Sequence, residues 1–450
     1  MSNLLQSTNV ATALARQSLP PAQPANLDTL PRATSKGRRL IFVNRYFHPD
    51  HSATSQMLSD LAFALARDGE DVAVISSRQL YQRADARLAA RERVHDVEVY
   101  RAGSTRFGRA GIIGRTVDYL SFHVTAAIAL ARIARRDDIV VAMTDPPLMS
   151  VTAAIVAKFK RFRLVNWLQD LYPEVAFHSG IAFTDGWLGR LLCWARNRSL
   201  GAAAANVAIG EQMALRLERE NVPRGRIAMI SNWTDDLNIM PTDCDNPLRE
   251  DWDLKGKFVV GYSGNLGTAH EASAILGAAE ILKDRTDICF LVIGGGSRLS
   301  DLQREVRTRN LTNFVFKPHQ PRQLLPMTLT LPDVHWLSLR TEFEGLILPS
   351  KFYGIAAAGR AMILIGAETG ELARLVRSKD CGIAVAPTAH GRLARAISDL
   401  ADSPSLRADM GRNARRMIEA EYSMAASIQR WKALLAHLSL APTPKPTPAF

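Results

Sequence analysis

The feature that most constrains this chain is a repeated alternation of short apolar runs with segments of helical periodicity. The runs RLIFVN, DVAVISS, VEVYRA, DIVVAMT and RLVNWLQD are typical of strands, and helical segments such as SQMLSDLAFALARDG separate them. A second series starts at KFVVGYSGNLG and continues through CFLVIGGG, NFVFKPH, VHWLSLR and AMILIG. Strands joined through helices form parallel sheets with helices on both faces. The sequence therefore predicts an α/β chain with two doubly wound sheets.

The domain boundaries follow from where this periodicity stops. The N-terminal lead is rich in Ser, Pro, Ala and Asn, the C-terminal tail is rich in Pro, and a polar stretch separates the two series. A chain of 450 residues can also supply two cores. The predicted parts are a disordered lead at 1–36, an N-terminal domain at 37–240, a linker at 241–256, a C-terminal domain at 257–422, a helix at 423–438 and a disordered tail at 439–450.

Composition limits the compartment and the partners. The four cysteines are scattered without paired metal spacing, which argues against a disulfide framework and a zinc site. No apolar window reaches the roughly 18 to 20 residues of a spanning helix, and no secretory signal is recognisable, so we expect a cytoplasmic protein. The net charge of +12 favours an anionic partner. Nucleic acid is not expected, because no helix-turn-helix, zinc-finger or RNA-binding signature accompanies the charge.

Two glycine-rich turns follow strands of the second series. Residues 261–267, GYSGNLG, end one apolar run before a helix, and CFLVIGGG ends a second run at Gly294, Gly295 and Gly296. Free backbone N–H groups at such turns can hold a diphosphate, and ligands collect at the carboxyl ends of parallel strands. Tight βα turns also use glycine for geometry alone, so each turn by itself leaves both interpretations open.

The segment from Glu342 to Gly359, EFEGLILPSKFYGIAAAG, carries the most chemistry. Ser350 and Lys351 come near the start of a helix predicted to begin near Phe352. Backbone amides, the hydroxyl and the ammonium could converge there on a diphosphate and stabilise the charge of a departing nucleotide. A surface lysine beside a helix cap is the alternative.

The order of these motifs resembles glycosyltransferase family 4, the retaining enzymes of the GT-B architecture. YSGNLG, VIGGG and EFEGLILPSKFYGIAAAGRAMI carry the resemblance, and NRYFHPDHSATSQML, DIVVAMTDPP and WLQDLYPEVA support it in the N-terminal half. It extends from about Arg38 to Leu438 and is strongest for the branch that builds bacterial exopolysaccharide and O-antigen chains. The resemblance implies two Rossmann-like domains facing a central cleft, with a C-terminal helix.

The resemblance assigns the donor site to the C-terminal domain. Lys351 and Glu344 would be catalytic, with Lys351 neutralising the leaving group. Many relatives have an arginine near the first glycine turn. His270 is the closest candidate cation here, and a histidine on a helix surface is the alternative. The second glutamate of many members, which binds ribose, is replaced here by Gly354. The donor-binding residues would be Gly264, Asn265, Leu266, Gly294, Gly295, Gly345, Leu346, Ser350 and His270.

The acceptor would contact the N-terminal domain. The loop after the first strand and the ends of two later strands carry polar residues that should point into the cleft. The candidates are His48, Asp50, His51, Asp145, Asp170 and Glu174. Histidines near a turn also cap or solvate it, and Asp170 is equally well explained as a helix cap. The pattern has no metal-binding context, so no metal is expected.

A membrane contact is suggested by the segment FTDGWLGRLLCWARNRSL. It places Trp187, Leu188, Leu191, Leu192 and Trp194 near arginines, as in an amphipathic helix at a lipid interface. An ordinary core-facing helix with a basic outer face is the alternative.

These expectations combine into one predicted function. The chain would be a retaining glycosyltransferase that moves sugar from a UDP- or GDP-sugar to a polyprenyl-diphosphate-linked saccharide in bacterial cell-surface polysaccharide synthesis. It would need no cofactor and would lie at the inner face of the cytoplasmic membrane, in contact with anionic lipid. A nucleotide-sugar epimerase of the same fold is one alternative. A non-catalytic relative is the other alternative, because Gly354 stands where the ribose-binding glutamate is expected.

Overall fold

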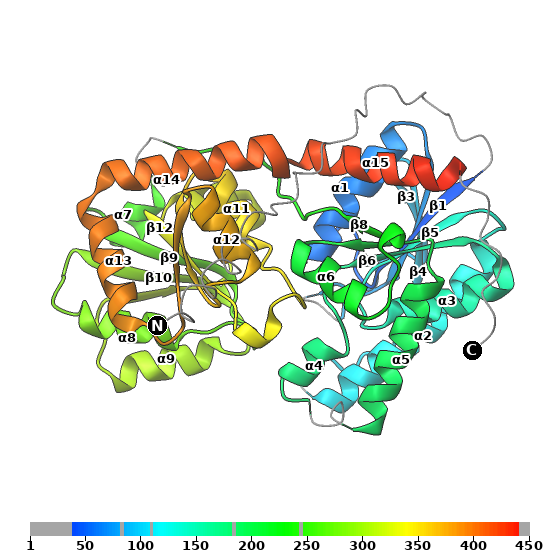
Figure 1. Ribbon diagram of the computed structural model, residues 1–450, viewed down its shortest axis with the longest axis horizontal. Helices are drawn as coiled ribbons and strands as arrows, with labels where there is room; N and C mark the ends of the chain where they lie inside the picture. Colours follow the sequence, from blue (N-terminus) through cyan, green and yellow to red (C-terminus); the bar gives the residue numbers. More distant parts are fainter. Residues whose placement is uncertain (1–37, 82–84, 109–110, 182–185, 243–245, 441–450) are drawn as a thin grey trace, which may run out of the picture. The chain divides into compact units, whose positions relative to one another are not determined.

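Two separate sheets, each covered by its own helices, make up the described part of the chain (Figure 1). The predicted lead at 1–36 lies outside the described residues, as does the predicted tail from residue 441 on. The computed structural model describes residues 38–81, 85–108, 111–181, 186–242 and 246–440.

The first sheet has eight strands in the order β3-β4-β2-β1-β5-β6-β7-β8. All neighbours pair in parallel except β3 and β4, which form an antiparallel edge that the sequence did not predict. The strands are β1 (Arg39–Val43), β2 (Asp71–Ser77), β3 (Arg91–Val94), β4 (Val97–Ala102), β5 (Ile139–Ala142), β6 (Arg163–Leu168), β7 (Ala205–Ala208) and β8 (Ile227–Met229).

Helices cover both faces of this sheet, and its central strands are therefore buried on both sides. One apolar cluster joins α1 to one face, and a second joins α2 and α3 to the other. The helices are α1 (Ala53–Arg67), α2 (Ile112–Ile133), α3 (Met149–Lys160), α4 (Glu174–His178), α5 (Trp187–Ala202) and α6 (Glu211–Arg219).

The second sheet is entirely parallel, with six strands in the order β11-β10-β9-β12-β13-β14. The order reverses direction beside β9, which makes the carboxyl ends of β9 and its neighbours the expected ligand edge. The strands are β9 (Phe258–Asn265), β10 (Ile288–Gly295), β11 (Phe314–Lys317), β12 (Val334–Ser338), β13 (Ala361–Ile365) and β14 (Gly382–Val385).

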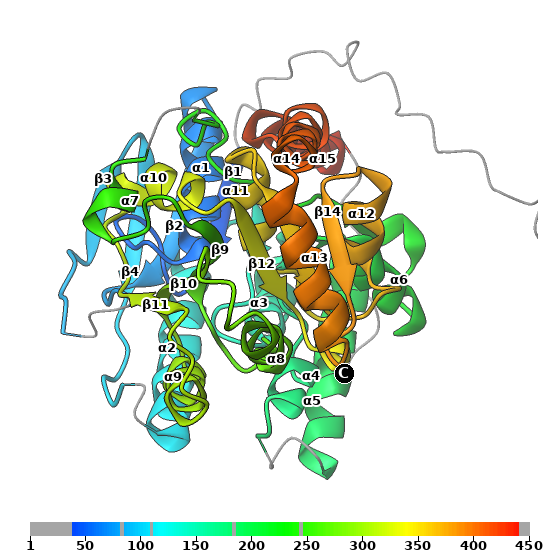
Figure 2. The same ribbon diagram turned by 90° about the vertical axis from the view of Figure 1, so that its left-hand side faces the viewer.

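The helices of the second half also form two layers. Those on one face include α8 and α13, which lie side by side (Figure 2), and those on the other include α11 and α12. The two Rossmann-like units confirm the predicted fold class. The helices are α7 (Leu248–Asp251), α8 (Ser273–Ile281), α9 (Leu299–Thr308), α10 (Leu325–Thr330), α11 (Lys351–Ala357), α12 (Glu371–Ser378), α13 (His390–Asp402), α14 (Pro404–Met417) and α15 (Met424–Leu440).

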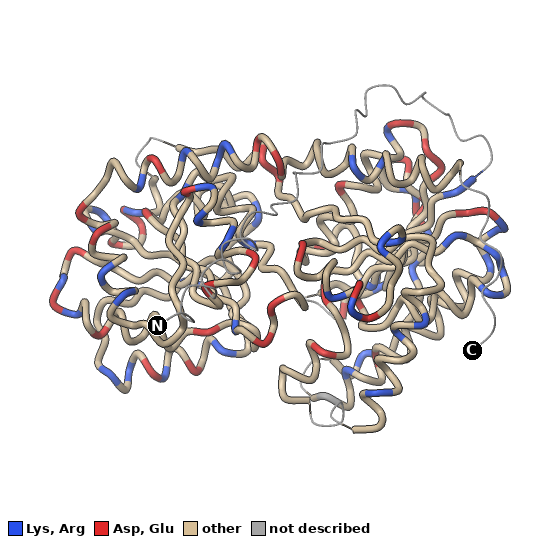
Figure 3. The backbone as a smooth tube through the Cα atoms, in the orientation of Figure 1, with Lys and Arg blue, Asp and Glu red and all other residues tan. Residues whose placement is uncertain are grey.

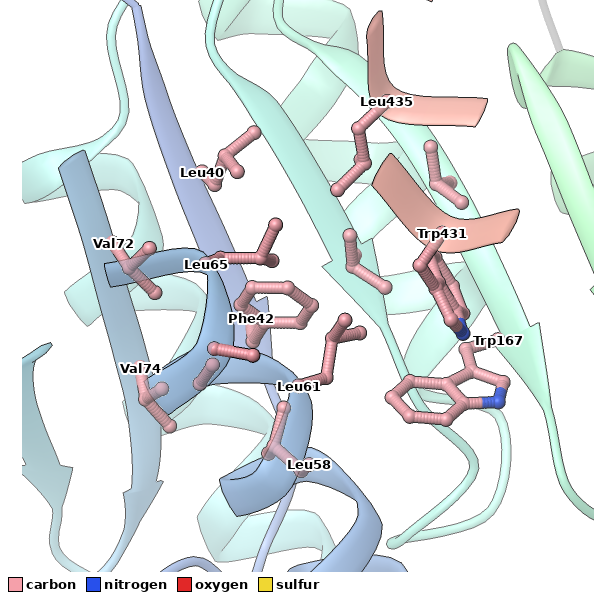
Figure 4. Packing of buried hydrophobic residues seen from close by; sticks show 14 of the residues in the cluster. Leu40, Phe42, Leu58, Leu61, Leu65, Val72, Val74, Trp167, Trp431 and Leu435 are labelled. Carbon is pink, nitrogen blue, oxygen red and sulfur yellow. The ribbon is translucent and has the colours of Figure 1, made fainter. Parts of the chain in front are cut away.

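The C-terminal helix packs on the first sheet, although it follows the second sheet in sequence. Helix α14 belongs to a core of the second half, and the π-helical turn Ile418–Tyr422 leads from it into α15. Trp431 of α15 is 0% exposed and joins the cluster that contains Phe42 of β1 and Trp167 of β6 (Figure 4). The ring centroids of Trp431 and Trp167 are 4.7 Å apart. Burial of this apolar stripe is what fixes the helix to the N-terminal domain.

We expect Trp431→Ala to lower the free energy of unfolding by about 3–5 kcal/mol, because it empties a ring-sized volume in a closed core. Trp431→Phe keeps most of that volume and removes an indole N–H for which the described residues provide no hydrogen-bond partner. It should cost much less. Urea unfolding followed by tryptophan fluorescence measures both. Equal losses in the two variants would show that the ring volume does not hold α15.

Candidate active site

The two predicted glycine turns lie side by side at the carboxyl ends of β9 and β10. Gly264 and Gly294 are paired in register and both have positive φ, 127° and 132°. A Cβ atom on Gly294 would lie 2.2 Å from the carbonyl oxygen of Gly264, so only glycine allows this approach. The Leu266 N–H donates to the carbonyl oxygen of Gly295 at 2.7 Å and locks the turns together.

Lys351 reaches into these turns from the start of α11. Its Nζ lies 2.8 Å from the Tyr262 hydroxyl and 3.0 Å from the carbonyl oxygen of Asn265. A Cβ on Gly264 would lie 2.6 Å from Cε of this lysine, so the second reason for glycine at 264 is the passage of the lysine stem. The residue with the strongest sequence prediction for catalysis is therefore seated on the first glycine turn.

Burial controls the charges around this amine. It lowers the pKa of Lys351 to about 7. It also lowers the pKa of His270 to about 4, and the neighbouring lysine charge acts in the same direction. The phenol of Tyr262 is likewise buried, which raises its pKa above the usual range. Near pH 7 the site therefore holds one amine close to its titration midpoint among neutral groups.

His270 is a neutral acceptor, which corrects the sequence-based suggestion that it supplies a cation. Its Nδ1 lies 2.7 Å from the carbonyl oxygen of Ser338, so that nitrogen carries the proton and donates. The other nitrogen, Nε2, lies 3.1 Å from Nζ of Lys351 and accepts from it. The imidazole orients the lysine rather than adding positive charge.

The other predicted donor residues lie in different surroundings. Ser350 stands at the N-cap position of α11, directly before Lys351. Leu266 and Leu346 are each 0% exposed, and their N–H groups donate to the carbonyl oxygens of Gly295 and Phe343, so both residues support the loops from below. Gly345, with φ of 71°, lies against the backbone of Gln212 at the start of α6.

Glu344 is held at the start of a different helix. Its carboxylate accepts from the N–H of Glu371 in α12 at 3.5 Å. Burial raises the pKa of Glu344, and the charge of Glu371 raises it further. This local pairing gives Glu344 a structural anchor that the sequence did not reveal.

The position that the resemblance pairs with a ribose-binding glutamate is narrow in this protein. Gly354 is buried in α11, and a Cβ there would lie 3.3 Å from Cδ1 of Leu329 and 3.9 Å from Oγ1 of Thr234. An added Cβ would require that leucine to shift by a few tenths of an ångström. The close packing explains why glycine suits this helix.

The predicted acceptor residues of the first loop have mainly local roles. Asp50 is 7% exposed, and its carboxylate accepts from the backbone N–H groups of Ser52 and Tyr81. The carbonyl oxygen of His48 accepts from Arg101 at 2.9 Å, while burial lowers the pKa of its ring. His51 is exposed. Asp50 therefore shapes the turn instead of offering free oxygens to a sugar.

The three later acceptor candidates differ in their surroundings. Glu174 forms ion pairs with Arg196 at 2.7 Å and Arg216 at 3.5 Å, so two guanidinium groups occupy the carboxylate predicted for the acceptor. Asp145 and Asp170 follow β5 and β6 and are close enough to interact electrostatically. Burial raises the pKa of Asp170 to about 7, and the charge of Asp145 contributes to the rise. Only this pair keeps the character of an acid–base site.

Tyr262 is the residue that the sequence analysis missed. It was part of the quoted YSGNLG motif, but nothing in its position announced a contact with Lys351. Its hydroxyl donates to the carbonyl oxygen of Asn265 at 2.9 Å, and the lysine Nζ lies 4.7 Å from its ring centroid. The available signal was a polar aromatic residue at the end of an otherwise apolar strand.

Two further observations concern metals and membranes. Within the described ranges, no group of three or more His, Cys, Asp or Glu residues is placed to hold a metal ion. No helix among the described residues is long and apolar enough to cross a membrane.

Family models match both halves of the chain. The model for a glycosyl transferase 4-like domain matches residues 52–233, and the model for glycosyl transferases group 1 matches residues 246–417. These matches define an enzyme that transfers glycosyl groups. More closely, the chain belongs to glycosyltransferase family 4 and has the GT-B fold, as the motifs predicted.

Named relatives agree with this assignment. The probable glycosyltransferase WbjE of Pseudomonas aeruginosa is 26% identical over 314 residues, which cover 69% of this chain and 78% of that protein. The putative colanic acid biosynthesis glycosyl transferase WcaI of Escherichia coli K12 is 28% identical over 238 residues, which cover 51% of this chain and 58% of that protein.

Solved structures share the fold at low identity. Sucrose-phosphate synthase of Thermosynechococcus elongatus superposes with a TM-score of 0.69 at 14% identity, covering 89% of this chain and 99% of that one. HepE of Anabaena in complex with UDP superposes with a TM-score of 0.66 at 13% identity, covering 89% of this chain and 100% of that one. These similarities show the architecture.

Gly294→Ala should lower the free energy of unfolding by roughly 1–3 kcal/mol or more, because the added Cβ meets the Gly264 carbonyl and the backbone conformation is unfavourable for alanine. Gly201→Ala in α5, where a Cβ meets nothing within 4 Å, is the matched control and should not destabilise. Chemical denaturation compares them. An equal effect of the two changes would contradict the close contact between the turns.

Proposed function

We propose that this enzyme transfers a sugar, with retention of anomeric configuration, from a UDP- or GDP-sugar to a lipid-diphosphate-linked saccharide during assembly of a bacterial cell-surface polysaccharide. The colanic acid name of WcaI supports the biosynthetic role, and the UDP in the HepE structure supports a nucleotide-sugar donor. Both belong to proteins that are similar to this chain. The reaction would take place at the inner face of the cytoplasmic membrane.

One observation carries the proposal, namely the buried amine of Lys351 beside two contacting glycine turns. Its pKa of about 7 reflects an ammonium that has lost water without gaining an anionic partner among the groups it contacts. A diphosphate is the anion that backbone N–H groups at glycine turns recognise. Its arrival would return to the amine the favourable charge interaction that burial removed.

The proposed step needs few side chains. The acceptor hydroxyl oxygen bonds to the anomeric carbon while the bond from that carbon to the diphosphate oxygen breaks. The hydroxyl proton passes to the departing diphosphate on the same face of the sugar, and the nucleoside diphosphate leaves. Negative charge grows on the leaving group, so a protonated Lys351 stabilises the transition state more than the bound substrate. Lysine and backbone amides do this in our proposal without a metal ion.

The acceptor hydroxyl would be oriented from the N-terminal domain. Asp145 and Asp170 are the candidates that keep an acid–base character, because burial and mutual repulsion hold a proton on the pair near neutral pH. A carboxyl pair with one proton can both donate to and accept from a sugar hydroxyl. We assign it to acceptor binding.

Lys351→Ala should reduce release of nucleoside diphosphate by roughly 100- to 1,000-fold, the usual loss when a charge-stabilising group at a leaving oxygen is removed. Purified protein would be incubated with a panel of UDP- and GDP-sugars, with and without membrane lipid extract. Lys283→Ala, an exposed lysine after α8, is the control and should leave release unchanged.

The same assay separates the alternatives. Lipid-dependent release that survives Lys351→Ala would contradict the role given to this residue. A new sugar epimer formed without acceptor would identify an epimerase, and no turnover of any donor would identify a non-catalytic relative.

Binding of UDP or GDP should weaken as pH rises above about 7. The pKa of Lys351 in the ligand-free protein is lowered to about 7, so the ammonium is present below that value and is lost above it. Since the diphosphate prefers the ammonium, affinity should fall by up to about ten-fold per pH unit. Calorimetric titration across this range measures the effect. Lys351→Met removes the amine and should flatten this dependence; a slope that persists in the variant would assign it to another group.

A further inference from the structure

Exposed apolar side chains gather on three neighbouring helices of the N-terminal domain. Among the described residues, half of the large apolar side chains that are exposed lie on α2, α3 and α5. Scattered apolar residues are normal on a surface, but a contiguous group marks a contact site. The two sides of each helix show how this group arises.

Helix α2 carries a complete apolar stripe on its outer side. Its inner side packs Phe122, Ala126 and Leu130 into the core of the first sheet. The outer residues recur every three or four positions, which places them on one face opposite the core. They are Ile113, which is 82% exposed, with Val117, Leu120, Val124 and Ile128.

Helices α3 and α5 continue the same outer surface. Phe159 of α3 is 76% exposed, and Ile155 lies one turn before it. On α5, Trp187 is 73% exposed, and Leu191 and Trp194 follow on the same face. The sequence left open whether the tryptophans of α5 face a core or a lipid interface; the structure turns them outward.

Hydrogen bonds join the three helices into one layer. Nδ1 of His123 in α2 lies 2.7 Å from Oγ1 of Thr152 in α3. The hydroxyl of Ser199 in α5 lies 2.9 Å from that of Ser150 in α3. Figure 1 shows the helices together beside the first sheet. We call the outer side of this layer the α2–α3–α5 face.

The charge on this face has a single sign. Helices α3 and α5 contain no Asp or Glu, and the acidic residue of α2, Asp118, is 2% exposed. The same three helices carry basic residues, which are drawn blue in Figure 3. They are Arg115 and Arg132 on α2, Lys158 and Lys160 on α3, and Arg190 and Arg198 on α5.

We propose that the α2–α3–α5 face docks on the surface of an anionic lipid bilayer. Exposed tryptophans and aliphatic side chains can enter the headgroup region, while arginine and lysine bind lipid phosphates around them. Charge argues against a second copy of this chain, because two such faces would bring like charges together. Arg198 lies over the Trp194 ring, 6.0 Å from its centroid, so a charged group and an aromatic group stand together on this face.

This inference deepens the proposed function, since a lipid-linked acceptor would be taken from the same bilayer. It does not depend on sugar transfer for its test. Vesicle binding without turnover of any donor would leave the docking face standing and overturn the proposed function. Turnover of a water-soluble acceptor analogue without vesicle binding would overturn the docking face and leave the proposed sugar transfer standing.

The test is co-sedimentation of the full-length protein with vesicles of phosphatidylcholine alone and of equal parts phosphatidylcholine and phosphatidylglycerol. We expect binding to the anionic vesicles that weakens with salt. Trp187→Ser with Trp194→Ser should weaken it by about ten-fold or more. Arg190→Gln and Arg198→Gln should each cost about five-fold at low salt.

Matched controls lie on the C-terminal domain. Ile281→Ser with Leu406→Ser removes two exposed apolar side chains, and Arg304→Gln removes an exposed arginine; neither should change vesicle binding. No binding to anionic vesicles, or binding that the α2–α3–α5 variants leave intact, would overturn the proposal. Self-association that the same variants abolish would assign the face to a second copy instead.

Fluorescence gives an independent readout. Trp167, Trp233, Trp336 and Trp431 are buried, and Trp252 is half-buried against a core of the C-terminal domain. A change in emission on vesicle binding should therefore come mainly from Trp187 and Trp194. Their emission should shift to shorter wavelength and be quenched by brominated lipid. Trp187→Phe with Trp194→Phe should retain binding and lose the shift. An unchanged shift in that variant would place the lipid contact elsewhere.

Discussion

The contact between the backbone at Gly264 and Gly294 is the constraint on which the candidate donor site depends. It brings the ends of β9 and β10 together without intervening side chains and leaves the Asn265 carbonyl oxygen available to Lys351. The lysine stem then passes over Gly264, where any side chain would block it. Any parallel sheet has a carboxyl edge where ligands collect, but the Lys351 amine can lie on this edge only because these two residues are glycines.

Much of the fold was predictable because parallel strands buried on both faces leave a simple record in sequence. Uniformly apolar runs such as that of β9, each followed by a helical segment, led directly to two doubly wound sheets. The antiparallel edge strand β3 escaped prediction, since its sequence RERV is polar and half-exposed. Periodicity predicted α15 as a helix, but not that Trp431 packs against Trp167 on the other domain's sheet.

The candidate site was predictable to the extent that it rests on local backbone geometry. Glycine turns and Ser350-Lys351 are contiguous motifs, whereas the contact of Lys351 with Tyr262 joins distant segments. The ionisation states could not be predicted either, because they depend on burial in the folded chain. His270 is neutral because the folded chain buries it. The sequence gives no sign that the carboxylate of Glu174 is paired. In the folded chain it forms ion pairs with Arg196 and Arg216 and so has a structural role.

The two halves meet anions by different physics. The candidate donor site buries one amine, and in our proposal a diphosphate would gain from every interaction that water no longer screens. The α2–α3–α5 face keeps its arginines and lysines at the surface, where each contributes little and their number matters. A buried site can discriminate the growing charge of a leaving group, while an exposed face can only concentrate the enzyme at a charged surface. Transfer of a sugar to a membrane-bound acceptor would require both.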